Sequence, residues 1–258
     1  MKHHFIVIAA AACAFLASTS ASLAANLVQN GNFEQSTNGA GQFSSYAAQT
    51  VVADWNTRAY ASIFTSGSAD TTGAYSPEFG FYLTLWGPAY GVNNGLTATS
   101  PDGGNFVGND ANYADGQYDV TAPIEQTING LTPGQSYNVG FYYAYGVQYG
   151  HVRATTQQWS VSLGSETQSL PVYDLPKYSF SGWSHADLVF TATAVSEVLG
   201  FTASGGPTGS PPFALLDGVT MNAVSVPEPT AWTMMIVGLG LLGGFARRRL
   251  SLAQSVAI

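Results

Sequence analysis

Two stretches of alternating apolar and polar residues, separated by a proline-glycine turn, constrain the fold of this chain more than any other feature. The residues that share one face are Ile124, Gln126 and Ile128 in the first stretch, and Tyr137, Val139, Phe141 and Tyr143 in the second. Between them, Thr132-Pro133-Gly134-Gln135 has the composition of a tight turn. Because a period of two residues is typical of a half-buried strand, the pattern predicts two strands joined as a hairpin.

Short strands are also expected further along the chain. Trp159, Val161 and Leu163 fall on one face of a third strand, and residues 186–192, 197–203 and 211–224 have strand character. Residues 204–213 contain three prolines and three glycines, which predicts a loop without ladder pairing. Residues 38–76 are expected to form strands linked by long loops. Without helical periodicity between residues 26 and 225, the sequence predicts one all-β domain over 25–225, a sandwich or barrel.

The first 24 residues are typical of a secretory signal peptide for the Sec pathway. Lys2 gives a basic start, Phe5 to Ala17 form an apolar core too short to span a bilayer, and Ser22-Leu23-Ala24 supply small residues for cleavage. The only cysteine, Cys13, lies within this segment. The exported chain therefore contains no disulfide, no zinc-thiolate site and no cysteine nucleophile.

Charge separates the exported domain from the two ends. Between residues 26 and 225 the basic residues are Arg58, Arg153 and Lys177, against fourteen acidic residues from Glu34 to Asp217. Such a surface repels a phosphate backbone, so the sequence argues against nucleic acid as a partner. Because only 9% of residues are charged, solubility depends mainly on hydroxyl and amide groups.

Two segments resemble the galactose-binding-like jelly-roll domains, the two-sheet sandwiches common among carbohydrate-binding modules. "NLVQNGNFE", residues 26–34, is similar to their first strand, and "FALLDGVTM", residues 213–221, is similar to their last. The resemblance implies a jelly-roll β-sandwich whose first and last strands are neighbours, with a structural calcium often near them. Carried over to this sequence, it implies Glu34 and Asp217 as calcium ligands. The alternative is that both residues only order strand ends, since Ca²⁺ takes six to eight oxygen ligands.

Aromatic residues supply the candidate ligand-binding side chains. Trp86, Tyr142, Tyr145 and Trp159 could present flat faces to sugar rings. A sandwich core also requires aromatics, and half of the residues on any strand point inward. Each tryptophan could therefore belong to the core instead, and Tyr142 and Tyr145 must lie on opposite faces of their strand.

No catalytic motif stands out in the exported part. Its two histidines, His151 and His185, belong to no recognisable triad or metalloprotease pattern. The acidic loop containing Asp102, Asp110, Asp115 and Asp119 lacks EF-hand spacing, and its "PDGG" is typical of a turn. Two carboxylates on distant strands leave no local signature, so a glycoside hydrolase remains open.

The C-terminal segment 226–250 combines three features in a fixed order. Pro227-Glu228-Pro229 is followed by the uncharged residues 231–246, and then by Arg247, Arg248 and Arg249. Sixteen uncharged residues are short for a transmembrane helix, but flanking arginines make such a span tolerable and place residues 251–258 in the cytoplasm.

This combination closely resembles the PEP-CTERM sorting signal, with Trp232 matching its tryptophan-containing subclass. The resemblance implies a transient inner-membrane helix, recognition by an exosortase and cleavage near the triplet. It also implies delivery to the cell surface or to the exopolysaccharide matrix of a Gram-negative biofilm. The alternative is a permanent single-span anchor.

Together these observations favour an exported, extracellular protein whose β-sandwich is a non-catalytic binding or structural domain within exopolysaccharide, with carbohydrate binding as one such role. The alternative function is a secreted glycan hydrolase that uses a carboxylate pair.

Overall fold

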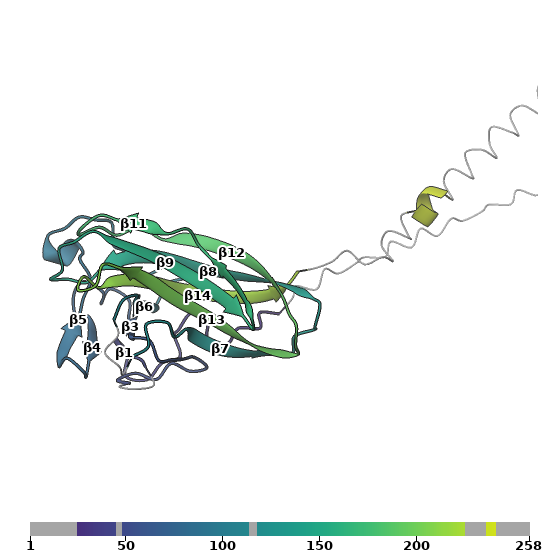
Figure 1. Ribbon diagram of the computed structural model, residues 1–258, viewed down its shortest axis with the longest axis horizontal. Coiled ribbons are helices and arrows are strands. Elements are labelled where there is room, and N and C mark those ends of the chain that lie inside the picture. The colour runs from purple at the N-terminus through teal and green to yellow at the C-terminus, as the bar shows by residue number, and fades with distance from the viewer. Residues whose placement is uncertain (1–24, 45–47, 114–117, 225–235, 241–258) are drawn as a thin grey trace, which may run out of the picture.

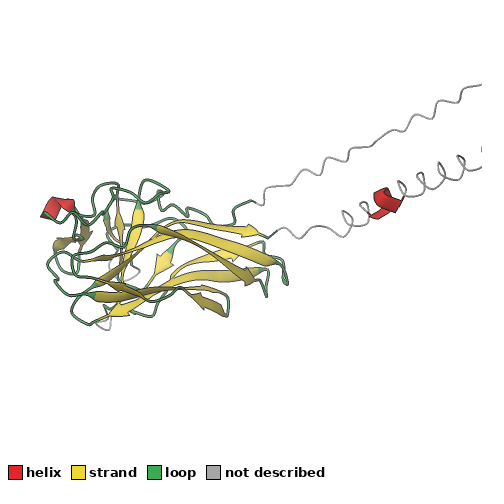
Figure 2. Cartoon of the chain, turned by 90° about the horizontal axis from the view of Figure 1, so that it is seen from above, coloured by secondary structure: helices red, strands yellow, loops and turns green. Residues whose placement is uncertain are grey.

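Short strands from the whole length of the exported domain build two sheets that pack face to face (Figures 1 and 2). A computed structural model describes residues 25–44, 48–113, 118–224 and 236–240. Apart from the short 3-10 helix η1 (Pro88–Tyr90) and the helical residues 236–240, its regular elements are strands. The all-β sandwich predicted from the sequence is confirmed.

The larger sheet has eight strands in the order β12-β8-β14-β6-β3-β1-β4-β5. Their bounds are β1 (Gly41–Gln42), β3 (Ala61–Phe64), β4 (Ala74–Ser76), β5 (Phe81–Leu83), β6 (Phe106–Asp110), β8 (Ser136–Val147), β12 (Ser184–Thr191) and β14 (Pro212–Ala223). The pairs are antiparallel except for β1 with β4. The two longest strands of this sheet, β8 and β14, are neighbours near one side of it.

The smaller sheet has the order β10-β9-β13-β7-β2, and β11 also pairs with β9. Its strands are β2 (Asn56–Thr57), β7 (Ile124–Asn129), β9 (Thr155–Leu163), β10 (Glu166–Ser169), β11 (Tyr173–Leu175) and β13 (Ser196–Gly206). The expected strands around Trp159, Ala186 and Glu197 correspond to β9, β12 and β13.

The hairpin predicted over residues 124–143 is wrong, although both of its strands exist. β7 pairs with β13 and β2 in the smaller sheet, whereas β8 pairs with β12 and β14 in the larger one. The turn at residues 132–135 therefore carries the chain from one sheet to the other. The predicted faces are correct, because Tyr137, Val139 and Phe141 are buried against the core.

The N-terminal segment 26–34 forms no strand, contrary to expectation, but it does lie beside the last strand. The backbone N–H of Leu27 donates to Met221 O, and that of Val219 donates to Gly31 O, both at 2.9 Å. A Cβ on Gly31 would lie 1.9 Å from the carbonyl oxygen of Val219. Only glycine allows this close approach, which holds the start of the domain against β14.

The segment 204–213 is not wholly a loop. Ser204, Gly205 and Gly206 continue the β13–β9 ladder, and β14 already begins at Pro212. A Cβ on Gly205 would lie 2.4 Å from Thr156 O, so glycine here permits the strands to approach rather than ending the ladder.

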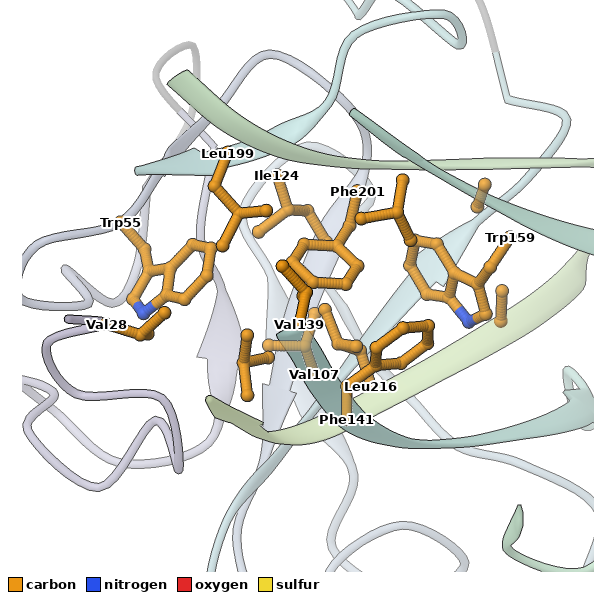
Figure 3. Close-up of a cluster of buried hydrophobic side chains, with 14 of the residues drawn as sticks. Val28, Trp55, Val107, Ile124, Val139, Phe141, Trp159, Leu199, Phe201 and Leu216 are labelled. Atoms are coloured by element: carbon orange, nitrogen blue, oxygen red, sulfur yellow. The ribbon is translucent and has the colours of Figure 1, made fainter. Parts of the chain in front are cut away.

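The main core lies between the two sheets (Figure 3). Val107, Val139, Phe141 and Leu216 project from the larger sheet toward Phe201 and other residues of the smaller one. The inward residues alternate along each strand with residues on the outer faces, as the period of two requires. The ring of Phe201 makes an edge contact with that of Phe141, with centroids 5.1 Å apart.

A second core covers part of the outer face of the larger sheet. Phe213 and Leu215 of β14 point away from the main core and pack with Phe64 and Phe106. Segments outside this ladder contribute the buried residues Ala69, Leu85, Tyr118 and Phe180. Both faces of β14 are therefore buried along its first half, which explains its continuous apolar run.

The predicted signal peptide and most of the C-terminal segment, including the Pro-Glu-Pro triplet and the three arginines, lie outside the described residues. In the described part of the chain, no helix is long and apolar enough to cross a membrane. β14 ends at Ala223, just before the predicted sorting signal and at one end of the sandwich (Figure 1). The helix η1 lies at the opposite end of the domain (Figures 1 and 2).

Candidate functional site

Two of the four aromatic residues expected to bind a ligand belong to the main core. Trp159 has no exposed surface, and its indole Nε1 donates to Leu215 O at 3.1 Å. Tyr145 is 1% exposed and lies on the inner face of β8. Neither side chain can reach a ligand at the surface. They are buried because their positions on β9 and β8 face the opposite sheet. Alternation in the sequence predicts which residues share one face of a strand, but not which face the other sheet covers.

Tyr142 lies on the outer face of β8, opposite Tyr145, as the alternation predicts. It is half-buried, and its ring makes an edge contact with His185 of β12, with centroids 4.8 Å apart. His185 pairs with Asp187 at 3.3 Å. Tyr142 is thus accessible, but it stands apart from the other aromatic clusters of the surface.

Trp86 is different, because it lies in a cluster of four aromatic rings that we call the Trp86 cluster. Its other members are Tyr90, Tyr149 and Tyr178. The centroid of Trp86 lies 4.7 Å from that of Tyr149 and 4.7 Å from that of Tyr178, both in edge contacts. Tyr90 and Tyr149 stack at 3.6 Å with 17° between their planes. Tyr149 is 43% exposed, so the cluster opens to solvent.

Hydrogen bonds hold the Trp86 cluster in one arrangement. The Trp86 indole Nε1 donates to His151 O at 2.7 Å, and the Tyr90 hydroxyl donates to Thr84 Oγ1 at 3.0 Å. The side-chain amide of Asn94 donates to both Trp86 O and Tyr178 O, at 2.8 and 2.9 Å. Rings fixed in this way lose little conformational entropy when a ligand binds.

The three segments that form the cluster are distant in sequence but meet at one end of the larger sheet. The backbone of residues 84–86 pairs with the end of β8, where Trp86 N donates to Val147 O and Tyr149 N donates to Thr84 O. η1 supplies Tyr90, and the chain after β11 supplies Tyr178. Sequence reasoning singled out Trp86 but missed Tyr90 and Tyr178, because no local pattern joins them.

A second group of exposed aromatic residues lies on the β4–β5 hairpin at the edge of the larger sheet. Phe79, Phe81 and Tyr82 are 43, 45 and 62% exposed. Phe79 and Phe81 stack with centroids 5.4 Å apart. The sequence analysis did not select these residues, although the run Phe79-Gly80-Phe81-Tyr82 was a visible signal.

The described part of the chain also forms two pockets that lie outside the Trp86 cluster. One, of about 620 Å³, is lined by Ala154, Thr155, Thr156, Asp174, Leu175, Pro176, Gly206 and Pro207. The other, of about 420 Å³, is lined by Gln29, Asp54, Asn56, Glu125, Gln126, Thr127 and Asn129. Only the second contains two carboxylates, and neither includes a residue of the Trp86 cluster.

The two residues expected to bind calcium meet at one corner of the sandwich. Asp217 accepts a hydrogen bond from the Ser100 hydroxyl, and its Oδ1 is buried without a hydrogen-bond partner. Glu34 accepts a hydrogen bond from Asn105 N at 2.5 Å. The carboxylates of Glu34 and Asp102 are close enough to raise the pKa of Asp217.

This corner offers an incomplete set of metal ligands. Across the described residues, no group of three or more His, Cys, Asp or Glu side chains is arranged to hold a metal ion. The orphaned Oδ1 of Asp217 suits a hard cation, but backbone or amide oxygens would have to supply most of the six to eight ligands. Asp102 belongs to the predicted turn, in which Gly103 and Gly104 adopt positive φ of 95° and 57°. Asp115 lies outside the described residues.

Burial raises the pKa of two aspartates to neutral pH or above. It raises the pKa of Asp217 to about 8, although hydrogen bonds from Ser100 and the Gly218 backbone oppose the shift. It also raises the pKa of Asp110 to about 7, against backbone hydrogen bonds from Asn112 and Tyr113. Both side chains are 4% exposed or less, so they are positioned as structural rather than accessible acids.

These raised pKa values predict that stability falls as pH rises. Because the folded state keeps protons that the unfolded chain loses near pH 3.8, unfolding becomes easier between pH 4 and pH 8. Urea denaturation with a chelator present should show a loss of more than ~1 kcal/mol between pH 5 and pH 8. Asp217→Asn should remove about half of this loss.

Asp54→Asn provides a matched control for Asp217→Asn, since it makes the same substitution at an exposed aspartate. A wild-type protein that becomes more stable toward pH 8, or an Asp217→Asn protein with the wild-type slope, would contradict the assignment.

Comparison with known proteins identifies the C-terminal segment. The PEP-CTERM protein-sorting motif matches residues 225–249, which contain the triplet and the arginines predicted as a sorting signal. The chain is also similar to Halomucin of Haloquadratum walsbyi (strain DSM 16790 / HBSQ001), at 29% identity over 232 residues. That match covers 88% of this chain but only 2% of Halomucin.

Several solved structures match this chain at low similarity. The CBM22-1 xylan-binding domain from Paenibacillus barcinonensis Xyn10C is 9% identical, with a TM-score of 0.36 over 81% of this chain and 100% of that domain. A CBM4 structure is 12% identical, with a TM-score of 0.34 over 76% of this chain and 99% of that one.

A bacteriophage CBA120 tailspike protein 4 domain is 13% identical, with a TM-score of 0.33 over 77% of this chain and 21% of that chain. The chain is thus a β-sandwich protein that carries a PEP-CTERM motif near its C-terminus, which marks it as exported and sorted to the cell surface.

Proposed function

We propose that this protein is a non-catalytic component of the cell surface or exopolysaccharide matrix that binds glycans through the Trp86 cluster. The observation that carries the proposal is a set of four interlocked aromatic rings, fixed by hydrogen bonds and open to solvent at Tyr149. Flat aromatic faces with nearby hydroxyl and amide groups suit the alternating apolar and polar faces of sugar rings.

The position of the cluster supports this role. It is built beside the start of β14, where Gln148 N donates to Pro211 O, whereas the sorting motif follows the other end of the same strand. A strand of 12 residues spans roughly 35 Å. A domain held through its C-terminal segment therefore presents the Trp86 cluster away from the point of attachment.

The charge of the domain limits the class of ligand that it can bind. With fourteen acidic and three basic residues between positions 26 and 225, the domain repels nucleic acid, anionic lipid and highly anionic polysaccharide. Uncharged or amine-bearing glycans are not repelled by this negative charge. We therefore propose a polysaccharide without a dense negative charge as the ligand.

A glycan hydrolase remains the alternative, and the pocket that contains Asp54 and Glu125 is the place for its carboxylate pair. The location of the acids with raised pKa values favours binding over hydrolysis. These acids, Asp110 and Asp217, are buried, and they line neither pocket. Release of reducing ends from matrix polysaccharide, lost in Asp54→Asn or Glu125→Gln, would favour the enzyme instead.

Removing rings from the Trp86 cluster should weaken glycan binding. In titration calorimetry with a neutral oligosaccharide selected on a glycan array, Tyr149→Ala should lower affinity by about tenfold and Trp86→Ala by more, since each ring supplies apolar contact area. Because Trp86 also packs against the main core, its variant must first show a native unfolding transition.

Tyr82→Ala is the matched control, because Tyr82 is more exposed than Tyr149 but lies on the β4–β5 hairpin. Equal losses in both variants, or full affinity in Tyr149→Ala, would remove the Trp86 cluster as the binding site.

For the sorting motif we propose recognition by an exosortase and cleavage near Pro227-Glu228-Pro229, after a stage in which residues 231–246 span the inner membrane. The mature surface protein should then lack the peptide from Trp232 to Arg249. Mass spectrometry of the protein released from the cell surface measures this. A mass that includes that peptide would instead establish a permanent anchor.

We also propose that Glu34 and Asp217 contribute to a structural calcium site. Because Ca²⁺ would bind the folded but not the unfolded chain, millimolar calcium should raise the melting temperature by several degrees over chelator at pH 8. The increase should be lost in Asp217→Asn. Identical melting curves of the wild type with calcium and with chelator would refute the site.

A further inference from the structure

We propose that the pocket between β9, β11 and the end of β13 is a saccharide subsite that takes one N-acetylhexosamine unit of the bound glycan. This inference deepens the proposed function and rests on it, since the pocket would act together with the Trp86 cluster. Its volume of about 620 Å³ falls within the range of small-molecule binding sites.

The composition of the pocket wall defines the ligand chemistry. Ala154, Pro176 and Pro207 offer apolar surface, and Thr156 adds an exposed hydroxyl, whereas Thr155 and Leu175 line the pocket but are themselves buried. Asp174 contributes the only charged side chain of the lining. A ligand that complements this wall needs a small apolar group, a nitrogen or oxygen donor for the carboxylate, and hydroxyls of its own.

An N-acetyl sugar carries these groups together. Its methyl group matches the apolar wall, its amide N–H can donate to the Asp174 carboxylate, and a ring hydroxyl can hydrogen-bond with Thr156. A uronic acid would bring its carboxylate beside Asp174 and into a strongly acidic domain, which Coulomb repulsion opposes. A free amino sugar could pair with Asp174 but would leave the apolar wall without a partner.

Chain segments on both sides of the pocket also contact the Trp86 cluster. On one side, Leu175 and Pro176 line the pocket, and Tyr178, two residues further on, packs against Trp86. On the other side, Gly206 and Pro207 line the pocket, and the same loop carries Gly209, whose carbonyl oxygen lies 3.2 Å from His151 Nδ1. His151 also accepts the indole hydrogen bond of Trp86. One glycan chain could therefore contact both.

Gly206 allows the pocket to be filled without disturbing the fold. A Cβ at this position would have its nearest neighbours at 3.9 Å, the Asn112 amide nitrogen and Thr156 Oγ1, which is an ordinary van der Waals distance. Gly206 is not in the left-handed region, so a side chain meets no backbone strain there. Gly206→Val should therefore occupy the pocket and leave the Trp86 cluster intact.

The test compares three oligosaccharides of equal length, built from N-acetylglucosamine, glucosamine or glucose, on the full-length protein by titration calorimetry. The wild type should bind the N-acetylated chain about tenfold more tightly than the glucose chain, as expected for one hydrogen bond to a carboxylate plus methyl burial. Gly206→Val should abolish this preference, and Asp174→Asn should reduce it. Both should still bind the glucose chain through the Trp86 cluster.

Asp54→Asn is the matched control for Asp174→Asn, since it removes an exposed aspartate of the other pocket. The inference is overturned if the wild type binds the N-acetylated and glucose chains equally, if it prefers the glucosamine chain, or if the preference survives Gly206→Val. In those cases binding of the glucose chain that depends on Tyr149 would still uphold the proposed function. Loss of binding to all three chains would contradict both proposals.

Discussion

The antiparallel ladder between β8 and β14 is the interaction on which the rest of the sandwich depends. Along β14, Ala214 and Leu216 face the main core while Phe213 and Leu215 face the second core, so one strand joins both hydrophobic layers. Its two ends have different surroundings. The start of β14 lies beside the Trp86 cluster, and its last half is paired with the N-terminal segment through Leu27 and Gly31. Loss of this ladder would therefore disconnect the end of the domain that carries the Trp86 cluster from the end that precedes the sorting motif.

This architecture accounts for the division between core and surface aromatics. Rings on the inner faces of β8 and β9, such as Tyr145 and Trp159, fill the space between the sheets. Aromatic rings on the loops beyond the strand ends do not fill the space between the sheets. Those near the start of β14 pack against one another instead. The Asn94 side chain donates hydrogen bonds to Trp86 O and Tyr178 O, which fixes these two loops without strand pairing between them. The result is a rigid aromatic surface carried by loops, which is a common way for a sandwich to present a binding site.

The sequence predicted which faces of the strands are buried, but not which strands are neighbours. Alternation placed Tyr137, Val139 and Phe141 on one buried face, because face depends only on the period of two. It failed for the β7–β8 hairpin, because pairing depends on long-range contacts with β13 and β14. Nothing in the sequence distinguishes Trp86 from Trp159, but Trp159 of β9 is fully buried in the main core whereas Trp86 is only partly buried. The sorting motif could be read directly, since all of its features are contiguous in residues 225–249.

The account's central claim is that the Trp86 cluster, and no other tryptophan site, contacts the glycan. The indole N–H groups of Trp55, Trp86, Trp159 and Trp183 are bonded to different acceptors and should be separable in a ¹⁵N–¹H correlation spectrum. Titration with a neutral oligosaccharide should shift the indole signal of Trp86 and leave those of Trp55 and Trp159 in place. A shift of the Trp183 signal without one of Trp86, or no indole shift at saturating ligand, would contradict the account.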